Sequence, residues 1–540
     1  MKLLLSIFIV FWFQVYGQQN DLNGNDINLW PYPQHVKLDE DYLTVDPNEF
    51  NIILKASGKC DLLEKAIQRY RKLYFLEDCS LVNSDVVVDT IFDGVIKLDV
   101  NKNVGKLTNV TLEVHQPCES EPYLHMSEMY SIEFNQQITK IFAETNWGAI
   151  RALETLSQLI RNVGKHQFIV NVTAITDYPR FAFRGVMLDT SRHYVPIREI
   201  QQNLDAMAYN KFNVFHWHIV DDQSFPYVSE VFPELSLKGA FNAKTHIYTK
   251  EEIQNIVDYA KERGIRVLVE FDSPGHTQSW GKGQPGLLAR CYNKGRPMDS
   301  FGPIDPSQSA NYEFIEKLFK EVITRFPDQY LHLGGDEVDF TCWASNPDIL
   351  AFMKSRNITN NFAKLEEYYI QNVLDIVKGL NKSYIVWQEV FDNGVKIKED
   401  TVVHVWKGDS WQKELFNVTK AGYQSIVSAC WYLNYISYGT DWPNYYACDP
   451  QNFGGSEQQN KLVIGGEACM WGEWVDGTNV ISRTWPRAIA VAERLWSSKD
   501  KKGMLEVSPR FNRQHCLMQQ RGLRVQPANG SGFCQCDYAV

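Results

Sequence analysis

The chain has 540 residues, of which 44% are hydrophobic and 22% are charged, so it can bury a large core and is typical of a globular protein. Its formal net charge is −11 with no run of five like charges, which argues against a nucleic-acid partner, because phosphate binding needs clustered Lys and Arg. Aromatic residues make up 13%, including 15 Trp; most must fill the core, but a surplus of Trp is also typical of sugar-binding pockets.

The first 17 residues have the pattern of a secretory signal peptide. Lys2 supplies the short positive region, residues 3–15 are almost all apolar, and small residues lie near a cleavage point after Gly17. A signal anchor is the alternative, but this run is too short for a comfortable membrane span, and no later stretch reaches 18 apolar residues. We therefore expect a protein of the secretory pathway with no stable membrane span after signal cleavage.

Export to an oxidising compartment favours disulfides among the cysteines. There are 11 of them, so at least one thiol is free or is paired between chains. No C-x-x-C pair occurs, which argues against a structural zinc site. Asn-x-Ser/Thr sequons, which exported chains often use for glycosylation, begin at Asn109, Asn171, Asn357, Asn381, Asn417 and Asn529.

The segment that follows the signal peptide predicts a small α+β domain over residues 18–177. Its first dozen or so residues are polar, and short strands are predicted at 86–88, 96–100 and 111–114. A helix is predicted over 147–161, because apolar residues recur there at helical spacing.

The pattern changes at residue 178, after which apolar strands alternate with amphipathic helices to the end of the chain. Strands are predicted at 184–189, 214–220, 266–271, 330–333, 384–387, 402–406, 424–428 and 462–466, and helices at 197–210, 250–264, 311–326, 362–378 and 487–495. Such βα units form a parallel sheet, and eight of them indicate a (β/α)₈ barrel, which we assign to residues 178–540 together with a C-terminal tail. An open doubly wound sheet is the alternative, weakened because no G-x-G-x-x-G follows the first strand.

Polar and aromatic residues cluster just after each predicted barrel strand. The clusters are residues 189–193, 216–222, 270–276, 334–337, 387–389, Trp406, 431–432 and 467–474. In a (β/α)₈ barrel the carboxyl ends of all strands share one face, and active sites lie on that face. Each cluster alone could be a turn or a helix cap, but their recurrence predicts one shared site.

The residue types in this site favour acid/base chemistry by carboxylates. No Ser lies in a G-x-S-x-G elbow and no Cys has a convincing activated setting, so acyl transfer lacks support. Several carboxylates in a pocket with aromatic walls are typical of a glycosidase.

A metal-dependent hydrolase is the main rival. His216 and His218 are two residues apart on a predicted strand, so both side chains point to one face, and with Asp272 or Asp336 they could hold Zn²⁺. The alternative is that both histidines form hydrogen bonds inside the barrel wall. The Trp residues fit a sugar pocket better than a metal cage, and we predict no metal site.

The adjacency of Asp336 and Glu337 restricts the mechanism. A retaining glycosidase with two enzyme carboxylates needs them about 5–5.5 Å apart across the bond. Neighbours in an extended strand point to opposite sides, so these two are unsuited to flank one glycosidic bond. If Glu337 is the general acid, Asp336 has another role, while Asp221, Asp272 or Glu389 remain candidates for a nucleophile.

Several motifs resemble those of one known family. Residues 332–338, His-Leu-Gly-Gly-Asp-Glu-Val, resemble the signature of family 20 β-N-acetylhexosaminidases. Residues 188–194, 215–222, 271–276 and 467–473 are also similar to motifs of this family. The resemblance extends from about Trp30 onward and is greatest to the lysosomal and animal enzymes.

The resemblance implies a retaining, substrate-assisted mechanism, in which the 2-acetamido oxygen of the substrate attacks the anomeric carbon and forms an oxazolinium ion. By this similarity Glu337 is the general acid and then the base. Asp336 orients the acetamido group, and Tyr432 donates a hydrogen bond to its carbonyl oxygen. Asp221 and His276 form a relay towards Glu337.

The same resemblance implies which residues bind the terminal sugar. Trp387, Trp406 and Trp471 form the wall of the pocket, while Arg192 and Glu473 bind the outer hydroxyls and restrict cleavage to the non-reducing end. Asn434 lies where family members differ in how they accommodate the next group. Its neighbour Tyr435 is neutral, so a preference for sulfated or sialylated substrates is not supported.

Further expectations follow from the family. It implies the disulfides Cys60–Cys118, Cys291–Cys342 and Cys516–Cys534, leaving Cys79, Cys430, Cys448, Cys469 and Cys536 unassigned. It implies no cofactor, a homodimer, a lysosomal or extracellular location, and a carbohydrate substrate carrying terminal GlcNAc or GalNAc. A catalytically inactive sugar-binding protein is a further alternative, which the presence of Asp336, Glu337, Tyr432 and Arg192 argues against.

Overall fold

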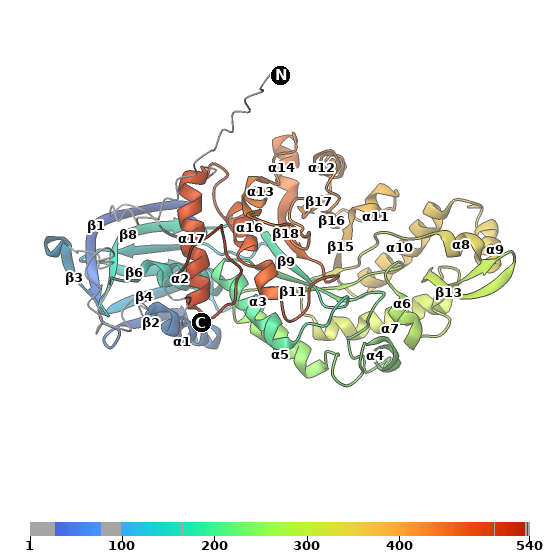
Figure 1. Ribbon diagram of the computed structural model, residues 1–540, viewed down its shortest axis with the longest axis horizontal. Coiled ribbons are helices and arrows are strands. Elements are labelled where there is room, and N and C mark those ends of the chain that lie inside the picture. The colour runs from blue at the N-terminus through green and yellow to red at the C-terminus, as the bar shows by residue number, and fades with distance from the viewer. Residues whose placement is uncertain (1–27, 77–98, 164–165, 502, 535–536, 538–540) are drawn as a thin grey trace, which may run out of the picture.

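The computed structural model describes residues 28–76, 99–163, 166–501, 503–534 and 537. These residues form an open sheet at one end of an elongated molecule and a closed barrel beside it (Figure 1). The signal peptide, the strand predicted at 86–88 and most of the strand predicted at 96–100 lie outside the described residues.

The described part of the N-terminal domain is a mixed sheet in the order β2-β4-β6-β5-β8-β1-β3, with β7 paired to β8. Its strands are β1 (His35–Val45), β2 (Asn51–Ser57), β3 (Asn103–Leu107), β4 (Asn109–Pro117), β5 (Tyr130–Phe134), β6 (Thr139–Ala143), β7 (Arg161–Asn162) and β8 (Phe168–Asp177). The strand predicted at 111–114 is the centre of β4. Val100, in contrast, begins a 3₁₀ helix, η2 (Val100–Lys102), because the Asp99 side chain accepts a hydrogen bond from the Asn101 backbone and caps that turn.

Two helices accompany this sheet. In α1 (Asp61–Tyr74), Leu63, Ala66, Tyr70 and Tyr74 form one buried stripe at helical spacing. The helix α2 (Asn146–Leu159) is buried along its whole length, because it packs against the sheet and its Arg151 reaches backbone carbonyls of the barrel region. It ends before Arg161, where the chain instead pairs with β8.

The barrel is closed by eight parallel strands in the order β10-β11-β14-β15-β16-β17-β18-β9. They are β9 (Phe183–Asp189), β10 (Val214–Val220), β11 (Arg266–Phe271), β14 (Tyr330–His332), β15 (Ser383–Trp387), β16 (Val402–Val405), β17 (Gln424–Val427) and β18 (Val463–Met470). Each overlaps a predicted strand, since parallel strands buried on both faces read as apolar runs. A (β/α)₈ barrel preceded by a smaller α+β domain is thus confirmed.

Helices connect the strands and surround the barrel (Figure 1). They are α3 (Ile197–Tyr209), α4 (Glu234–Gly239), α5 (Lys250–Lys261), α6 (Gln278–Gly283), α7 (Ser309–Arg325), α8 (Thr341–Ser345), α9 (Pro347–Ser355), α10 (Phe362–Gly379), α11 (Gln388–Asp392), α12 (Trp411–Lys420), α13 (Trp442–Ala447), α14 (Glu457–Leu462), α15 (Val480–Thr484), α16 (Arg487–Trp496) and α17 (Met504–Gln520). The predicted helices correspond to α3, α5, α7, α10 and α16.

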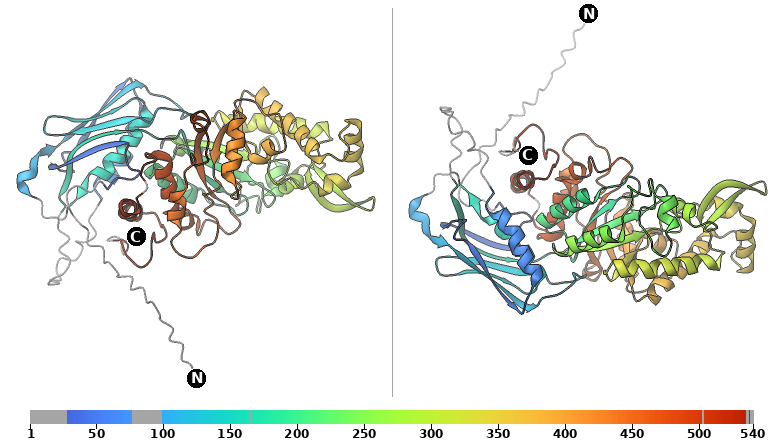
Figure 2. Two further views of the ribbon diagram at one scale, coloured as in Figure 1. Left: turned by 90° about the horizontal axis from the view of Figure 1, so that it is seen from above. Right: turned by 90° about the horizontal axis from the view of Figure 1, so that it is seen from below.

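The two ends of the molecule differ in construction. Both views in Figure 2 place the N-terminal sheet at one end and, at the other, a hairpin of β12 (Leu288–Asn293) and β13 (Arg296–Ile304). The disulfide Cys291–Cys342 ties this hairpin to α8. The C-terminal helix α17 lies beside the N-terminal domain, where Arg521 pairs with Glu154 of α2 at 3.0 Å (Figure 1).

The structure contains the three disulfides implied by the resemblance, Cys60–Cys118, Cys291–Cys342 and Cys516–Cys534. It adds Cys430–Cys448, and Cys469 is a buried free thiol. Cys79 and Cys536 lie outside the described residues. Among the helices that the structure describes, none is both long and apolar enough to cross a membrane.

Candidate active site

The loop after β14 carries the two adjacent carboxylates. Gly334 has φ +65°, and a Cβ atom there would lie 1.7 Å from Oδ1 of Asp272, so only glycine lets the loop pass the end of β11. The backbone N–H of Gly335 then donates to the same Asp272 oxygen at 2.8 Å. Asp336 and Glu337 therefore lie in a turn and not on a strand, which corrects the strand geometry assumed from the sequence.

These two neighbours nevertheless occupy different surroundings. Asp336 is only 6% exposed, whereas the side chain of Glu337 is 61% exposed. Glu337 also has a left-handed backbone, with φ +50°, which is uncommon outside glycine and is found preferentially at functional sites. The turn thus buries one carboxylate and presents the other to an incoming substrate.

His276 lies between several carboxylates. Its Nε2 is 3.8 Å from Asp336 Oδ2, 3.8 Å from Glu337 Oε2 and 4.0 Å from Asp272 Oδ2, while its Nδ1 is 3.2 Å from Asp221 Oδ1. Burial alone would lower the pKa of His276, but Asp272, Asp221 and Asp336 together raise it to about 11. The ring is therefore an imidazolium at neutral and acidic pH.

Asp221 anchors the far side of this ring. Its carboxylate also receives His218 Nε2 at 2.8 Å and Arg192 Nη2 at 2.8 Å. Burial would raise the pKa of Asp221, but His218, His276 and Arg192 outweigh it and hold the pKa well below its ordinary value. Asp221 thus remains a carboxylate with three positively charged partners.

Asp272 behaves in the opposite way. Its burial, followed by the nearby charge of Asp336, raises the pKa of Asp272 well above the ordinary value. Asp272 therefore keeps its proton beside Asp336, and it accepts the Gly335 N–H as well. A protonated, buried carboxyl group in this position is unsuited to attack a sugar carbon.

Aromatic side chains form the wall of the cup. The rings of Trp387 and Trp471 are 6.1 Å apart, those of Trp406 and Tyr432 stack at 6.0 Å, and Tyr432 lies 6.5 Å from Trp471. Trp406 Nε1 donates to Glu389 at 2.8 Å, and Lys407 pairs with the same carboxylate at 2.9 Å. Glu389 is thus held by the wall of the cup and is not free to act as a nucleophile.

Arg192 lies at the edge of this wall. It pairs with Asp189 at 2.9 Å and with Asp221 at 2.8 Å, and its guanidinium lies over Trp471 at 4.9 Å. Burial would lower the pKa of Arg192, but Asp189, Asp221 and the exposed Glu473 raise it. Sequence reasoning gave Asp189 no role, although its spacing of three from Arg192 in one loop was the available signal.

Asn434 and its neighbour differ in exposure. Asn434 is partly buried, and its side-chain oxygen has no hydrogen-bond partner among the described residues. Tyr435 is 66% exposed and stacks on Tyr432 at 5.8 Å. All the catalytic and sugar-binding candidates named from the sequence thus come from the carboxyl ends of the barrel strands.

The two histidines of β10 do not lie with the metal ligands considered from the sequence. His216 has Glu467 at 2.8 Å from Nδ1 and Glu270 at 3.0 Å from Nε2, while His218 has Glu270 at 2.6 Å from Nδ1 and Asp221 at 2.8 Å from Nε2. Every ring nitrogen of the pair therefore faces a carboxylate, and these carboxylates are not Asp272 or Asp336. The hydrogen-bonded alternative from the sequence is the one observed.

The comparison with known proteins decides the family. The pattern of the glycosyl hydrolase family 20 catalytic domain matches residues 181–499, and that of a β-acetyl hexosaminidase-like domain matches residues 29–159. The chain belongs to glycosyl hydrolase family 20. The family expected from the sequence motifs is thereby confirmed, and the protein is a glycoside hydrolase.

Relatives of this family 20 enzyme cover almost its whole length. It is 48% identical to the β-hexosaminidase subunit alpha of Bos taurus, over 95% of this chain and 96% of the relative. It is 46% identical to the β-hexosaminidase subunit beta of Homo sapiens, over 94% and 89% of the two chains. The solved structure of a Flavobacterium johnsoniae chitobiase superimposes with a TM-score of 0.78 and 30% identity, covering 92% of this chain and 73% of the other.

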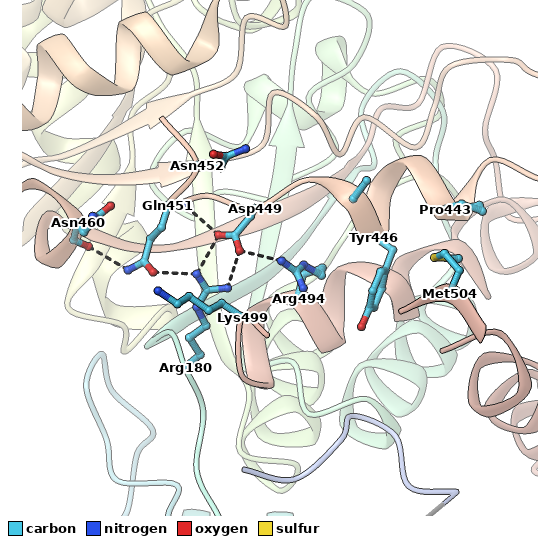
Figure 3. Close-up of a pocket in the computed structure, with 11 residues that line it drawn as sticks. Arg180, Pro443, Tyr446, Asp449, Gln451, Asn452, Asn460, Arg494, Lys499 and Met504 are labelled. Carbon is cyan, nitrogen blue, oxygen red and sulfur yellow. Dashed lines mark hydrogen bonds and ion pairs between the residues drawn. The ribbon is translucent and has the colours of Figure 1, made fainter. Parts of the chain in front are cut away.

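A separate pocket of the enzyme lies away from the cup. Figure 3 shows it, about 500 Å³ in volume, beside α13, α14 and α16. Asp449 bridges Arg180 at 2.8 Å and Arg494 at 2.7 Å across it. Both arginines are thus occupied by one carboxylate that links three segments of the fold, and none of the catalytic candidates lines this pocket.

Proposed function

We propose that this family 20 enzyme is an exo-acting β-N-acetylhexosaminidase, which removes terminal non-reducing GlcNAc or GalNAc by a retaining, substrate-assisted mechanism. The observation that carries the proposal is the state of the carboxylates. Glu337 is exposed at the mouth, whereas Asp221, Asp272 and Glu389 are each engaged by hydrogen-bond partners in the cup. With one free acid and no free enzyme nucleophile, the nucleophile is supplied by the substrate.

In the first step, the carbonyl oxygen of the 2-acetamido group forms a bond to the anomeric carbon while the bond to the leaving oxygen breaks. Glu337 gives its proton to that leaving oxygen and becomes a carboxylate. The sugar becomes a cyclic oxazolinium ion, whose positive charge is shared by the amide nitrogen. Asp336, which lies buried beside the protonated Asp272, accepts the N–H of that group and stabilises the charge.

In the second step, the Glu337 carboxylate takes a proton from water as the water oxygen bonds to the anomeric carbon. The bond from that carbon to the acetamido oxygen breaks, which restores the acetamido group and the protonated acid. Two displacements at the same carbon give net retention of configuration.

The cup supplies groups that hold the substrate. Tyr432 donates its hydroxyl proton to the acetamido carbonyl oxygen and orients it for attack. Trp387, Trp406 and Trp471 enclose the acetyl methyl group and pack on the apolar face of the ring. Arg192 and Glu473 bind the outer hydroxyls, and Asn434 lies towards the next sugar.

The relay from Asp221 through His276 to Glu337 serves the proton transfers. The imidazolium of His276 lies near both Glu337 and Asp336 and is fixed from behind by Asp221. A fixed positive charge favours the carboxylate that Glu337 becomes after the first step.

The cellular setting and assembly also belong to the proposal. We assign cleavage after Gly17, an N-terminal domain of residues 18–177, a catalytic unit of residues 178–540, and a lysosomal or extracellular location. The disulfides support an oxidising compartment. A homodimer is supported by large exposed apolar side chains after β17, namely Tyr435, Ile436 and Tyr438.

A substrate panel tests the proposal. The wild-type protein should release the aglycone from aryl β-N-acetylglucosaminides and β-N-acetylgalactosaminides, be inhibited by a thiazoline mimic of the oxazolinium ion, and be unaffected by dialysis against a strong chelator. Loss of turnover on chelation would support a metal-dependent hydrolase instead. Absence of turnover on every substrate, with sugar binding retained, would indicate an inactive binding protein.

The Glu337→Gln variant tests the assignment of the acid. It should lower kcat by roughly 10²–10⁴-fold, the usual contribution of a general acid. Wild-type kinetics in a folded Glu337→Gln protein would contradict the assignment.

A further inference from the structure

Glu270 is a buried carboxylate of β11 that the reaction steps above do not use. It is 0% exposed and lies near the carboxyl end of the strand. In the register of the parallel strands it stands opposite His218 of β10 on one side and His332 of β14 on the other. Its side chain thus faces two histidines from neighbouring strands.

Four nitrogen atoms surround this carboxylate. His218 Nδ1 is hydrogen-bonded at 2.6 Å and Trp387 Nε1 at 2.8 Å. His216 Nε2 lies at 3.0 Å and His332 Nδ1 at 3.1 Å. Trp387 comes from β15, so the Glu270 carboxylate contacts side chains from three other barrel strands, β10, β14 and β15.

Two of these contacts lead to two groups of residues in the cup. Through His218 the chain of contacts continues to Asp221, then to His276 and then to Glu337. Through Trp387 it reaches the aromatic wall, since the ring of Trp387 lies 6.1 Å from that of Trp471 and 6.4 Å from that of Trp406. The proton relay and the wall of the acetamido pocket therefore share one anchor.

The charges around Glu270 favour its ionised form. Burial would raise the pKa of Glu270, but His332, His218 and His216 hold it well below the ordinary value. Burial would lower the pKa of His216, but Glu467 and Glu270 raise it to about 9. Burial, with the nearby charges of His332 and His216, lowers the pKa of His404, and burial lowers the pKa of His332.

We propose that Glu270 is a positioning residue that couples the proton relay of Glu337 to the Trp387 wall of the acetamido pocket. The inference rests on the proposed function, because both branches end at groups assigned there. Removal of the Glu270 carboxylate should disturb acid catalysis and oxazolinium recognition together. The titratable groups around Glu270 are His216, His218, His332, His404, Asp272 and Cys469, and Asp221 and Glu467 lie behind His218 and His216.

The Glu270→Gln variant is the first test, because glutamine keeps the shape and removes the charge. On aryl N-acetylglucosaminides, kcat/KM should fall roughly 10–100-fold, as is usual for a buried group that orients a catalytic one. The loss should be larger for poor leaving groups, which depend most on acid assistance, and the thiazoline inhibitor should bind more weakly. Wild-type kinetics in a folded protein would overturn the proposal.

Matched variants distinguish the loss of this coupling from a general effect on stability. His218→Gln should change the leaving-group dependence more than the binding of the thiazoline, because its ring also lies 4.9 Å from that of Trp471. Trp387→Phe should change the binding of the thiazoline more than the leaving-group dependence. Glu366→Gln changes another buried carboxylate, which accepts from Asn393 and lies outside the network, and should leave kinetics unchanged. A Glu366→Gln loss equal to that of Glu270→Gln would mean that any buried carboxylate change disturbs the site, and would overturn the proposal.

If Glu270→Gln does not fold, a double-mutant cycle decides the matter. His218 and Trp387 both contact Glu270, and both rings also lie near Trp471, at 4.9 Å and 6.1 Å. The cycle of His218→Gln and Trp387→Phe is therefore repeated in a Trp471→Phe background, where coupling through Glu270 should still make the combined loss differ from the product of the single losses. Simple multiplication of the two losses would overturn the proposal.

A readout independent of turnover distinguishes failure of this inference from failure of the proposed function. The short His218–Glu270 hydrogen bond, at 2.6 Å, should give a low-field imidazole N–H resonance in the proton NMR spectrum. That resonance should be lost or shifted in Glu270→Gln and kept in Glu366→Gln. An unchanged resonance in Glu270→Gln overturns the coupling, whereas an inactive wild type with the expected resonances overturns only the proposed function.

Discussion

Nε2 of His276 lies 3.8 Å from Oε2 of Glu337, while Nδ1 of the same ring lies 3.2 Å from Asp221. The first distance is longer than a hydrogen bond, as is common for catalytic contacts before substrate is bound. The second contact fixes the ring, so closure of the gap requires movement of Glu337, whose side chain is exposed. The relay is therefore fixed at the Asp221–His276 contact, whereas the exposed Glu337 side chain can move.

This relationship makes Asp221→Asn a specific test of the relay. The change removes a negative charge beside His276, so the pKa of His276 should fall from about 11, and the basic limb of the pH–kcat profile should move to lower pH. We expect kcat to fall roughly 10–100-fold, with the larger loss on poor leaving groups. Initial rates from about pH 4 to 11 measure both effects.

The control is Asp258→Asn, which changes an exposed carboxylate of α5 that pairs with Lys261 and accepts a hydrogen bond from Gln254. It should reproduce the wild-type pH profile. A basic limb that stays in place in Asp221→Asn would show that His276 is not governed by Asp221.

Asp336→Asn tests the orientation of the acetamido group. The variant keeps the shape of the buried side chain but removes the charge that stabilises the oxazolinium ion. We expect kcat to fall roughly 10²–10³-fold, as when one group that stabilises transition-state charge is lost, and the thiazoline inhibitor to bind correspondingly less tightly. Titration calorimetry with the thiazoline measures the second effect.

Glu337→Gln is the matched comparison, because it alters the neighbouring carboxylate but not the contact with the acetamido nitrogen. It should bind the thiazoline far better than Asp336→Asn does. Equal affinities in the two variants would mean that the two carboxylates are not divided between the two roles.

The hydrophobic pattern of the sequence predicted the barrel because each strand can be recognised from its own few residues. Each parallel strand is an apolar run, and the polar residues that end it are the ones that gather on the shared face. This placed Glu337, Asp336, His276 and Arg192 in one cup. It failed at Val100, where one Asp99 side chain caps a turn and overrides strand propensity.

Partners across the barrel were not predictable in the same way. Glu270 contacts His218 and Trp387 because the register of β10, β11 and β15 brings them together. That register cannot be read from a single sequence. Likewise Cys430 and Cys448 pair only because α13 carries the chain back to the end of β17. Glu270 was in a recognised cluster, but nothing local distinguished it from its neighbours.

The buried histidines predict how stability depends on pH. The pKa of His216 in the folded protein is about 9 and that of His276 about 11, above the ordinary value of about 6.5. Such groups gain a proton on folding, so their contribution is fully present below about pH 6.5 and is lost as pH rises through the folded values. Burial raises the pKa of Glu366 to about 7, which acts in the same direction between about pH 4.5 and 7.

Asp221 has the opposite effect at low pH. Its pKa is lowered in the folded protein, so its contribution is present above about pH 4 and is lost as pH falls further. The unfolding temperature should thus be highest at about pH 4.5–6 and decline by several degrees towards about pH 9. Scanning calorimetry across this pH range measures the unfolding temperature. The Glu366→Gln variant should lose part of the decline below pH 7. An unfolding temperature that rises towards pH 9 would contradict the raised pKa values of His216 and His276.

The sequons divide into two groups according to their side chains. Asn109, Asn357, Asn381 and Asn417 are exposed. Asn171 instead donates Nδ2 to the Asp39 carbonyl at 2.7 Å and accepts from Arg161 at 2.5 Å. Asn529 accepts from Trp442 Nε1 at 3.1 Å and donates to Asn512 at 2.5 Å.

A glycan is attached through Nδ2, so at the two engaged positions it would compete with these contacts. We therefore expect glycans at the four exposed sequons and little or none at Asn171 and Asn529. Enzymatic deglycosylation in ¹⁸O water followed by peptide mass spectrometry marks each occupied asparagine.

Asn357→Gln should remove one glycan without changing the unfolding temperature. Asn171→Gln should lower the unfolding temperature slightly, because the contacts to Asp39 and Arg161 depend on the shorter side chain. High occupancy at Asn171 would show that its contacts with Asp39 and Arg161 are not kept in the glycosylated protein.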